Sequence, residues 1–309
     1  IRVADGPQID GLETPQLFEH RVGQGLAGAE IAVAAQVVDL GVVAEFLGSG
    51  DIRFGVAGTN ANVHIFTFGG SAGAPSGPLT FNKRRFELAG THALSQINNN
   101  SAQNFTINTN LLASGTGTMT LTLGGTGAAL NTFAGTITNG SLTTLGLAKS
   151  DAASTWTLTN TGNSYNGVTT ITAGTLQVSA LANGGSNSSI GASTNAAANL
   201  VFGAPAATLR YTGGSHVTID RGFTMSSGEG GGATIESSDA GTLSFDNTVA
   251  IAYGTASQTR LLTLGGTNTG DNTFGKVIAN NTSATSLTKA GNGKWVLTNT
   301  NTYTGNTDV

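Results

Sequence analysis

The chain contains no cysteine and few charged residues, and these absences exclude several classes of function. Among its 309 residues there are 13 Lys and Arg and 17 Asp and Glu, so charged residues form only 10% of the sequence. Without Cys the chain has no disulfide framework, metal-thiolate site or thiol nucleophile. The net charge of −4 argues against a nucleic-acid partner, because phosphate binding needs clustered Lys and Arg. We interpret the basic cluster Lys83-Arg84-Arg85 as a solvated strand edge that discourages pairing.

Sequence motifs for catalysis, cofactor binding and metal binding are also missing. The four histidines, His20, His64, His92 and His216, are never within the spacing of metal ligands. The patterns H-E-x-x-H, G-x-S-x-G and G-x-x-x-x-G-K are absent. The sequence therefore predicts no catalytic residue, no cofactor or cofactor-binding residue and no metal ligand, and we expect that the chain is not an enzyme.

No long, uninterrupted hydrophobic run is present. The longest apolar segment, Leu26–Leu47, contains Glu30, Asp39 and Glu45, which argues against a membrane span. We expect no direct membrane insertion by this chain and interpret the segment as buried. The chain starts at Ile1 without a basic-then-apolar leader, which indicates a mature product or a defined piece of a longer protein.

Glycine and small β-forming residues take the place of the missing charge. The chain has 46 Gly and is 38% hydrophobic, which is too rich in β-formers for a disordered linker. Short segments of β-formers end at Gly or Asn, such as T-M-T-L-T-L-G-G at 118–125 and T-L-Q-V at 175–178. Such segments at regular spacing are typical of a solenoid with coils of about 20–30 residues.

One long unit occurs twice in the sequence. Leu147–Val168 matches Leu287–Val309, and further upstream Thr122–Phe133 matches Thr263–Phe274 at an offset of 141 residues. We expect inward apolar residues to stack on their like from coil to coil, and corresponding residues of the two copies to hold equivalent places. The clearest correspondences are Lys149 with Lys289, Trp156 with Trp295, Tyr165 with Tyr303 and Phe133 with Phe274.

The second copy reads L-T-K-A-G-N-G-K-W-V-L-T-N-T-N-T-Y-T-G-N-T from Leu287 onward. This pattern closely resembles the autotransporter-associated β-strand repeat, also called the passenger-associated transport repeat. The resemblance covers roughly Phe86–Val309. The first copy departs from the pattern, because Ser150-Asp151-Ala152 replaces the usual glycine-containing turn.

The resemblance implies a right-handed parallel β-helix displayed on the outside of a bacterial cell. It also places Asp220-Arg221 on the wall of the solenoid, where we expect a local ion pair or turn contact rather than a catalytic pair. Lys149 and Lys289 repeat, which indicates a structural role, since two identical active sites on one shaft would be unusual.

Charge divides the chain near Glu87. Of the 30 charged residues, 15 lie in residues 1–87, and the next is Lys149. We predict a β-rich N-terminal region at 1–87, which caps the first coil or serves assembly. Residues 88–309 are predicted to be an all-β parallel β-helix, built on two copies of a unit of roughly 140 residues.

Within the first region the predicted elements are short. They are an irregular arm at Ile1–Gly25, a hairpin at Val42–Val56, a strand at Asn62–Phe68, a loop at Gly69–Pro78 and a strand at Leu79–Leu88.

The favoured function is that of a structural surface protein, a stiff shaft or filament subunit that assembles head to tail with copies of itself. The second copy of the repeat stops at Val309 before its next strand, so we expect a continuing chain or a neighbouring chain to complete the coil. An alternative is an adhesin that binds glycan or a host surface through its loops and through exposed aromatic residues. The candidates are Trp156, Tyr165, Trp295 and Tyr303, although packing is the favoured role of these aromatics. The third alternative, a β-helix enzyme acting on polysaccharides, needs converging carboxylates, and no charged residue occurs between Leu88 and Ala148.

Overall fold

The structure is a computed structural model. It describes residues 44–46, 52–54, 64–68, 78–82, 86–90, 94–203, 206–226, 231–254 and 258–309. Several predictions concern residues outside these ranges. They are the arm Ile1–Gly25, most of the apolar segment Leu26–Leu47 (residues 26–43 and 47), most of the loop Gly69–Pro78 (residues 69–77), the basic cluster at 83–85, and His20 and His92.

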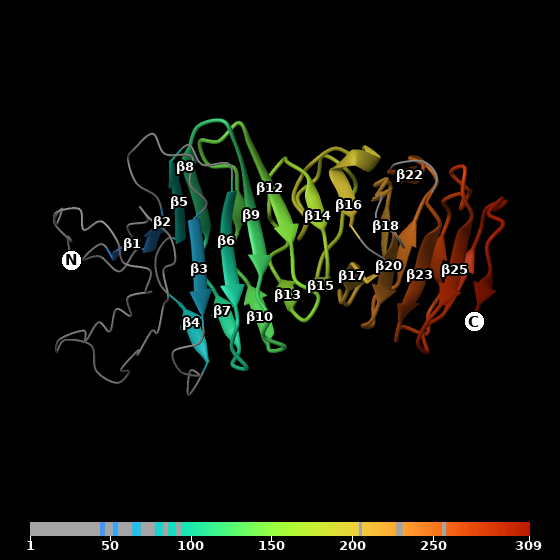
Figure 1. Cartoon of the computed structure of the whole chain (residues 1–309), viewed down its shortest axis with the longest axis horizontal. Coiled ribbons are helices and arrows are strands. Elements are labelled where there is room, and N and C mark those ends of the chain that lie inside the picture. Colours follow the sequence, from blue (N-terminus) through green and yellow to red (C-terminus); the bar gives the residue numbers. More distant parts are fainter. Residues whose placement is uncertain are drawn as a thin grey trace, which may run out of the picture.

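The described strands form three sides that run along the molecule (Figure 1). One side is an eight-stranded sheet of β3 (His64–Phe68), β6 (Leu94–Asn99), β9 (Thr118–Gly124), β12 (Thr144–Lys149), β14 (Thr169–Ile171), β16 (Leu200–Phe202), β19 (Thr224–Met225) and β22 (Ala252–Tyr253). The next is a ten-stranded sheet of β4 (Leu79–Phe81), β7 (Phe105–Ile107), β10 (Leu130–Phe133), β13 (Thr155–Leu158), β15 (Thr175–Val178), β17 (Thr208–Tyr211), β20 (Gly231–Ser237), β23 (Arg260–Gly266), β25 (Thr285–Lys289) and β27 (Thr307–Asp308).

The third side is divided into two sheets. A five-stranded sheet contains β1 (Ala44–Phe46), β2 (Ile52–Phe54), β5 (Phe86–Gly90), β8 (Leu111–Gly115) and β11 (Ile137–Thr138). A four-stranded sheet contains β18 (Val217–Ile219), β21 (Leu243–Phe245), β24 (Asn272–Phe274) and β26 (Trp295–Leu297). The only helical element among the described residues is the 3₁₀ turn η1 (Ala197–Asn199).

Each complete turn of the chain visits the three sides in the same order. From β6 the chain passes to β7 in the ten-stranded sheet and to β8 on the third side, and it then returns beside β6 as β9. Apart from the β1–β2 hairpin, the paired strands of the described residues run parallel. The interval between paired residues of neighbouring parallel strands ranges from 20 residues, between Trp156 and Leu176, to 34 residues, between Ile52 and Phe86. The predicted all-β parallel β-helix is therefore confirmed, with loops that absorb the unequal coil lengths.

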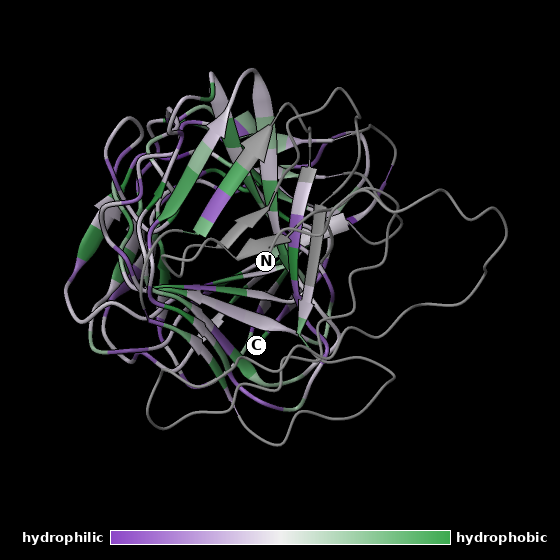
Figure 2. Ribbon diagram, turned by 90° about the vertical axis from the view of Figure 1, so that its left-hand side faces the viewer, coloured by the Kyte–Doolittle hydropathy of each residue, from purple (hydrophilic) through white to green (hydrophobic). Residues whose placement is uncertain are grey.

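Alternate side chains of the strands fill the interior. In β13, Trp156 is fully buried, whereas Thr155 and Thr157 on either side of it face outward. Apolar residues of successive coils stack as predicted, and the rings of Phe245 and Phe274, paired in register, lie 5.9 Å apart. Figure 2, a view along the stack, shows the strands arranged around this interior. Burial of each large apolar side chain stabilises the fold by about 1.5–3 kcal/mol.

The two copies of the repeat lie on different sides of the solenoid. Trp156 is in the ten-stranded sheet, whereas Trp295 is in the four-stranded sheet. Each Trp nevertheless pairs with the corresponding asparagine, Asn131 in the first copy and Asn272 in the second. Because coil lengths vary, the 141-residue offset is not a whole number of turns, and the second copy begins one side further around the shaft. The prediction that corresponding residues hold equivalent places is therefore confirmed for the residue with which each Trp pairs. It is wrong for the side of the solenoid on which each copy lies.

The structure corrects one predicted strand in the N-terminal region. The segment Leu79–Leu88, predicted to be a single strand, contains β4 and the start of β5. These belong to different sides, because β4 pairs with β7 in the ten-stranded sheet and β5 pairs with β8 on the third side. The hairpin predicted within Val42–Val56 is confirmed by the antiparallel pairing of β1 with β2. β3 and β4 already pair in parallel with β6 and β7, so the stacking begins upstream of Glu87. The division at Glu87 and the capping role stay predictions.

The turn after β12 shows how the first copy accommodates its departure from the repeat. Asp151 has φ 66°, the same value as Gly291 at the corresponding position of the second copy. This left-handed conformation suits glycine and strains other residues. The Asp151 carboxylate offsets the strain, because its Oδ2 accepts hydrogen bonds from the Gly125 backbone N–H at 2.8 Å and from the Ser150 hydroxyl at 2.7 Å.

We predict that Asp151→Gly is about 1 kcal/mol more stable than Asp151→Ala, because both variants lose the carboxylate but only alanine keeps the strain of positive φ. Chemical denaturation of the two variants measures this difference. The matched control is Ala152→Gly at the next, exposed residue of the turn, which has no positive φ and should be destabilised by about 0.5–1 kcal/mol. Equal stabilities of the two Asp151 variants would contradict the account of this turn.

Candidate functional site

The two repeated tryptophans pack in the wall of the solenoid. Trp156 is fully buried, and its Nε1 donates a hydrogen bond to the carbonyl oxygen of Gly124 at 3.0 Å. Trp295 makes the corresponding bond to Gly265 at 2.8 Å and is partly buried against the core. These contacts agree with packing, the favoured role of both residues, and leave Trp156 no open face for a sugar ring.

The repeated tyrosines also make one shared contact. Tyr165 is fully buried with its hydroxyl 2.8 Å from Thr169 Oγ1, and burial, opposed by that hydrogen bond and by Arg221, raises the pKa of the Tyr165 phenol well above its usual value. Tyr303 holds Thr307 Oγ1 at 2.7 Å in the second copy and packs partly buried against the core. Each tyrosine fixes the corner that leads into the next strand.

The repeated lysines bind backbone carbonyl groups at turns. Lys149 is fully buried, and its Nζ donates to the carbonyl oxygens of Ser150, Asp151 (2.8 Å) and Ala173 (3.1 Å). Lys289 Nζ donates to the two corresponding carbonyls that follow it, at 2.8 and 2.7 Å. The ammonium group therefore satisfies oxygens that have no partner in a strand ladder, and the predicted structural role agrees with these contacts.

A third lysine, Lys276, also donates hydrogen bonds to backbone carbonyl groups. It was not predicted from the sequence, because it has no counterpart in the first copy of the repeat. It is fully buried, and its Nζ donates to the carbonyl oxygens of Asp246 (3.1 Å) and Val249 (2.7 Å). Burial lowers the pKa of both Lys149 and Lys276 to about 8, although nearby carboxylates partly oppose the shift.

Asp220 and Arg221 hold the loop between β15 and β16 instead of facing a substrate. Arg221 is 2% exposed and donates to the carbonyl oxygens of Ala182 (2.8 Å), Ser193 (3.1 Å) and Gly191 (3.0 Å). Asp220 accepts from the Gly184 N–H at 2.8 Å and from Asn195 Nδ2 at 3.0 Å. The contacts are structural, but they join the pair to a loop of an earlier coil, 25 to 39 residues away, and are not the local ion pair or turn contact that was expected.

The remaining polar candidates do not converge. His216 is exposed, with one ring nitrogen 2.5 Å from Thr242 Oγ1 and the other 3.1 Å from Thr218 Oγ1. Over the described ranges, no three His, Asp or Glu residues are close enough together to hold a metal ion. The same ranges contain no helix of sufficient length and apolarity to cross a membrane.

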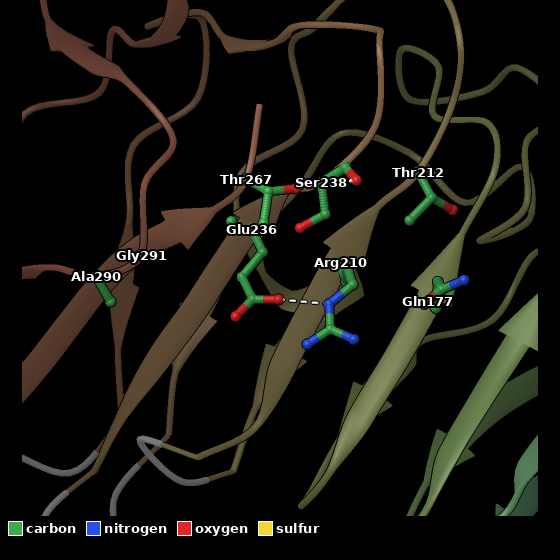
Figure 3. A pocket seen from close by; sticks show the side chains of 9 residues that line it. Gln177, Arg210, Thr212, Glu236, Ser238, Thr267, Ala290 and Gly291 are labelled. Carbon is green, nitrogen blue, oxygen red and sulfur yellow. Dashed lines mark hydrogen bonds and ion pairs between the residues drawn. The ribbon is translucent and has the colours of Figure 1, made fainter. Parts of the chain in front are cut away.

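A shallow groove of about 420 Å³ lies on the outer face of the ten-stranded sheet (Figure 3). Arg210 on β17 and Glu236 on β20 form an ion pair in it, with Arg210 Nε 2.5 Å from Glu236 Oε2. Their side chains are 33% and 21% exposed, respectively. The other lining residues are polar or small: Gln177, Thr212, Ser238, Gly266, Thr267, Ala290 and Gly291.

Sequence reasoning missed this groove, because its residues come from five coils and lie up to about a hundred positions apart. The only available signal was the rarity of charge, which makes Arg210 and Glu236 conspicuous once their strands are known to be neighbours. The groove offers hydrogen-bond donors and acceptors but only one carboxylate, so it lacks the carboxylate pair of a typical glycosidase.

We predict that Lys149 makes the free energy of unfolding rise with pH in the alkaline range. Its pKa is about 8 in the folded chain and about 10.5 in the unfolded chain, so between these values the unfolded state binds more protons and the free energy of unfolding rises with pH. Relative to Lys149→Met, wild type should gain up to about 1.4 kcal/mol per pH unit from pH 8 to pH 10, measured by urea unfolding. Lys294→Met, which removes a lysine with 57% exposure, is the control. If the free energies of unfolding of wild type and Lys149→Met differ by a constant amount over this pH range, the prediction is wrong.

Comparison with known proteins agrees with the repeat found in the sequence. Residues 153–178 and 287–309 match the passenger-associated-transport-repeat family. The chain is 39% identical over 283 residues to the adhesin BmaC autotransporter of Brucella suis biovar 1 (strain 1330). The aligned region covers 91% of this chain but 7% of that relative, so the chain spans a small part of the relative's length. No solved structure matches the chain significantly.

Both matches support the predicted location on the outside of the bacterial cell. The repeat found by the family comparison includes both tryptophan-containing strands described above, β13 and β26. The chain therefore carries the passenger-associated transport repeat and belongs to the repeat family that this match describes.

Proposed function

We propose that this chain is a non-enzymatic segment of the stiff shaft of a bacterial surface adhesin. The observation that carries the proposal is the ten-stranded sheet, in which every strand from β4 to β27 is hydrogen-bonded to its neighbours in parallel register. Such a stack resists bending because each coil is bonded to the next along its strands. The adhesin relative supports the surface role.

The polar groups of the shaft support a mechanical role over a catalytic one. The buried cations Lys149, Arg221 and Lys276 all donate to backbone carbonyls and so serve the shape of the coils. Glu236 is the only carboxylate among the residues that line the groove, and it is paired with Arg210, so the lining lacks the two acids that glycosidic bond cleavage typically uses.

The second, more specific part of this proposal is that copies of the chain assemble head to tail. β27 and β26 are the last strands of their sheets, and each has one neighbour among the described residues. The unpaired edge of such a strand is able to pair with a further coil, either from the same polypeptide or from a second copy.

Small-angle scattering of the purified chain over a concentration series tests both parts. We expect an elongated particle, since ten strands spaced by about 4.8 Å give a stack of roughly 45 Å. Head-to-tail assembly should lengthen the particle with concentration at constant cross-section, and deletion of residues 1–25 should stop this growth. A compact, near-spherical profile would contradict the shaft. Growth that persists without residues 1–25, or no growth of the full chain, would contradict the assembly and leave the shaft intact.

A further inference from the structure

We propose that the groove on the ten-stranded sheet binds a neutral, linear oligosaccharide that lies along the shaft, anchored by Gln177, Arg210 and Glu236. This inference rests on the proposed adhesin shaft and adds the site and the chemical class of ligand.

The three anchors form a straight row across the strands. Gln177 on β15 pairs in register with Arg210 on β17, which pairs in register with Glu236 on β20. Neighbouring strands are about 4.8 Å apart, so the row presents an amide, a guanidinium and a carboxylate at regular intervals along the axis of the shaft. Figure 3 shows these side chains on the same face of the sheet, with Arg210 and Glu236 joined by their ion pair.

The ion pair leaves hydrogen-bonding capacity for a ligand. It uses one nitrogen of Arg210 and one oxygen of Glu236, and among the described residues these two side chains hydrogen-bond only to each other. Two guanidinium nitrogens and the second carboxylate oxygen are left, and both side chains are partly exposed. Neighbouring donors and acceptors of this kind match the vicinal hydroxyl groups of a sugar, each of which both donates and accepts.

A second row of hydroxyl groups runs parallel to the anchors. Thr212, Ser238 and Thr267 follow β17, β20 and β23, respectively, and line the same groove. Thr212 and Thr267 donate weakly to backbone carbonyls of neighbouring coils, at 3.3 Å each, which leaves their oxygens able to accept. The hollow beside these rows exists because Gly266, Ala290 and Gly291 carry almost no side chain.

The chemistry of the groove favours a neutral sugar over other ligands. The charges of Arg210 and Glu236 cancel, and the carboxylate would repel an acidic polysaccharide that approached the guanidinium. An extended peptide adds to the free edge of a sheet, whereas this groove lies on the face of a sheet whose strands are already paired. No aromatic residue lines the groove, so binding depends on hydrogen bonds and each site should be weak.

The outer face of the sheet extends the polar surface along the shaft. One threonine of each strand from β13 to β25 pairs in register with a threonine of the next strand. These residues are Thr155, Thr175, Thr208, Thr234, Thr263 and Thr288. All of them are partly exposed except Thr208, which is 8% exposed and interrupts the row. A long glycan that follows the axis would meet this row beside the anchors, and several weak contacts on one chain would then add by avidity.

The decisive variant is Gly265→Val, which adds an apolar side chain beside Glu236 on the outer face of the sheet. A Cβ at Gly265, the residue paired with Glu236, would lie 3.5 Å from Glu236 Cγ and from the Ala290 carbonyl oxygen, which are ordinary contacts. Valine suits a strand position. The Gly265 carbonyl still accepts from Trp295 Nε1, so tryptophan fluorescence reports whether the fold is intact.

Binding of cellohexaose, xylohexaose and mannohexaose to the full chain is measured by calorimetry and by ligand-observed NMR, with hexagalacturonate as the acidic comparison. We expect at least one neutral hexasaccharide to bind more tightly than hexagalacturonate. Gly265→Val and Arg210→Met should each weaken that binding at least tenfold. The matched control, Thr157→Val, alters an outward residue of the same sheet beyond the groove and should bind like wild type.

The inference is overturned if none of the three neutral probes binds, if hexagalacturonate binds as tightly, or if Gly265→Val binds like wild type. It is also overturned if Thr157→Val loses as much binding as Arg210→Met. None of these results changes the scattering profile of the chain, so failure of the glycan site is distinguishable from failure of the proposed shaft.

Discussion

The structure depends on backbone hydrogen bonds between successive coils. A single coil has no partner for its own N–H and C=O groups, and it meets this requirement only through the coils above and below it. The bonds from Leu147 N to Val168 O (2.9 Å) and from Thr234 N to Ala207 O (3.0 Å) continue the ladder beyond the strand ends. The coils therefore fold as a stack, and the length of the stack is the length of the shaft.

Where the ladder breaks at a corner, side chains take over the same task. Lys149 and Arg221 donate to carbonyl oxygens of turns and loops, and Asn163 accepts from the backbone N–H of Ile137 at 2.9 Å. Asn301 repeats this last contact with Ile278 in the second copy, also at 2.9 Å. These buried polar side chains serve the corners of the shaft, whereas the outer face of the ten-stranded sheet carries hydroxyl groups and the ion pair of Arg210 with Glu236.

Strand content, the parallel solenoid and the packing role of Trp156 were predictable because they follow from local composition and from the spacing of the repeat. The side of the shaft that each copy occupies was not predictable, because it depends on the sum of all loop lengths between Trp156 and Trp295. The division of Leu79–Leu88 between two strands was missed because the segment contains no glycine or proline to indicate a break. The groove could not be predicted for a similar reason. Gln177, Arg210 and Glu236 become neighbours only through the register of three coils, which the sequence does not reveal.

In-register stacking of the coils is tested most directly by thiol cross-linking, which the absence of native cysteine makes unambiguous. Thr234 and Thr263 pair in register on β20 and β23, and their Cα atoms should be separated by about the strand spacing of 4.8 Å. Thr234→Cys/Thr263→Cys should therefore cross-link rapidly with a short thiol-specific reagent. Thr234→Cys/Thr273→Cys, with the second thiol on the four-stranded sheet, should not. Equal cross-linking of the two pairs, or none of either, would contradict the stacked shaft.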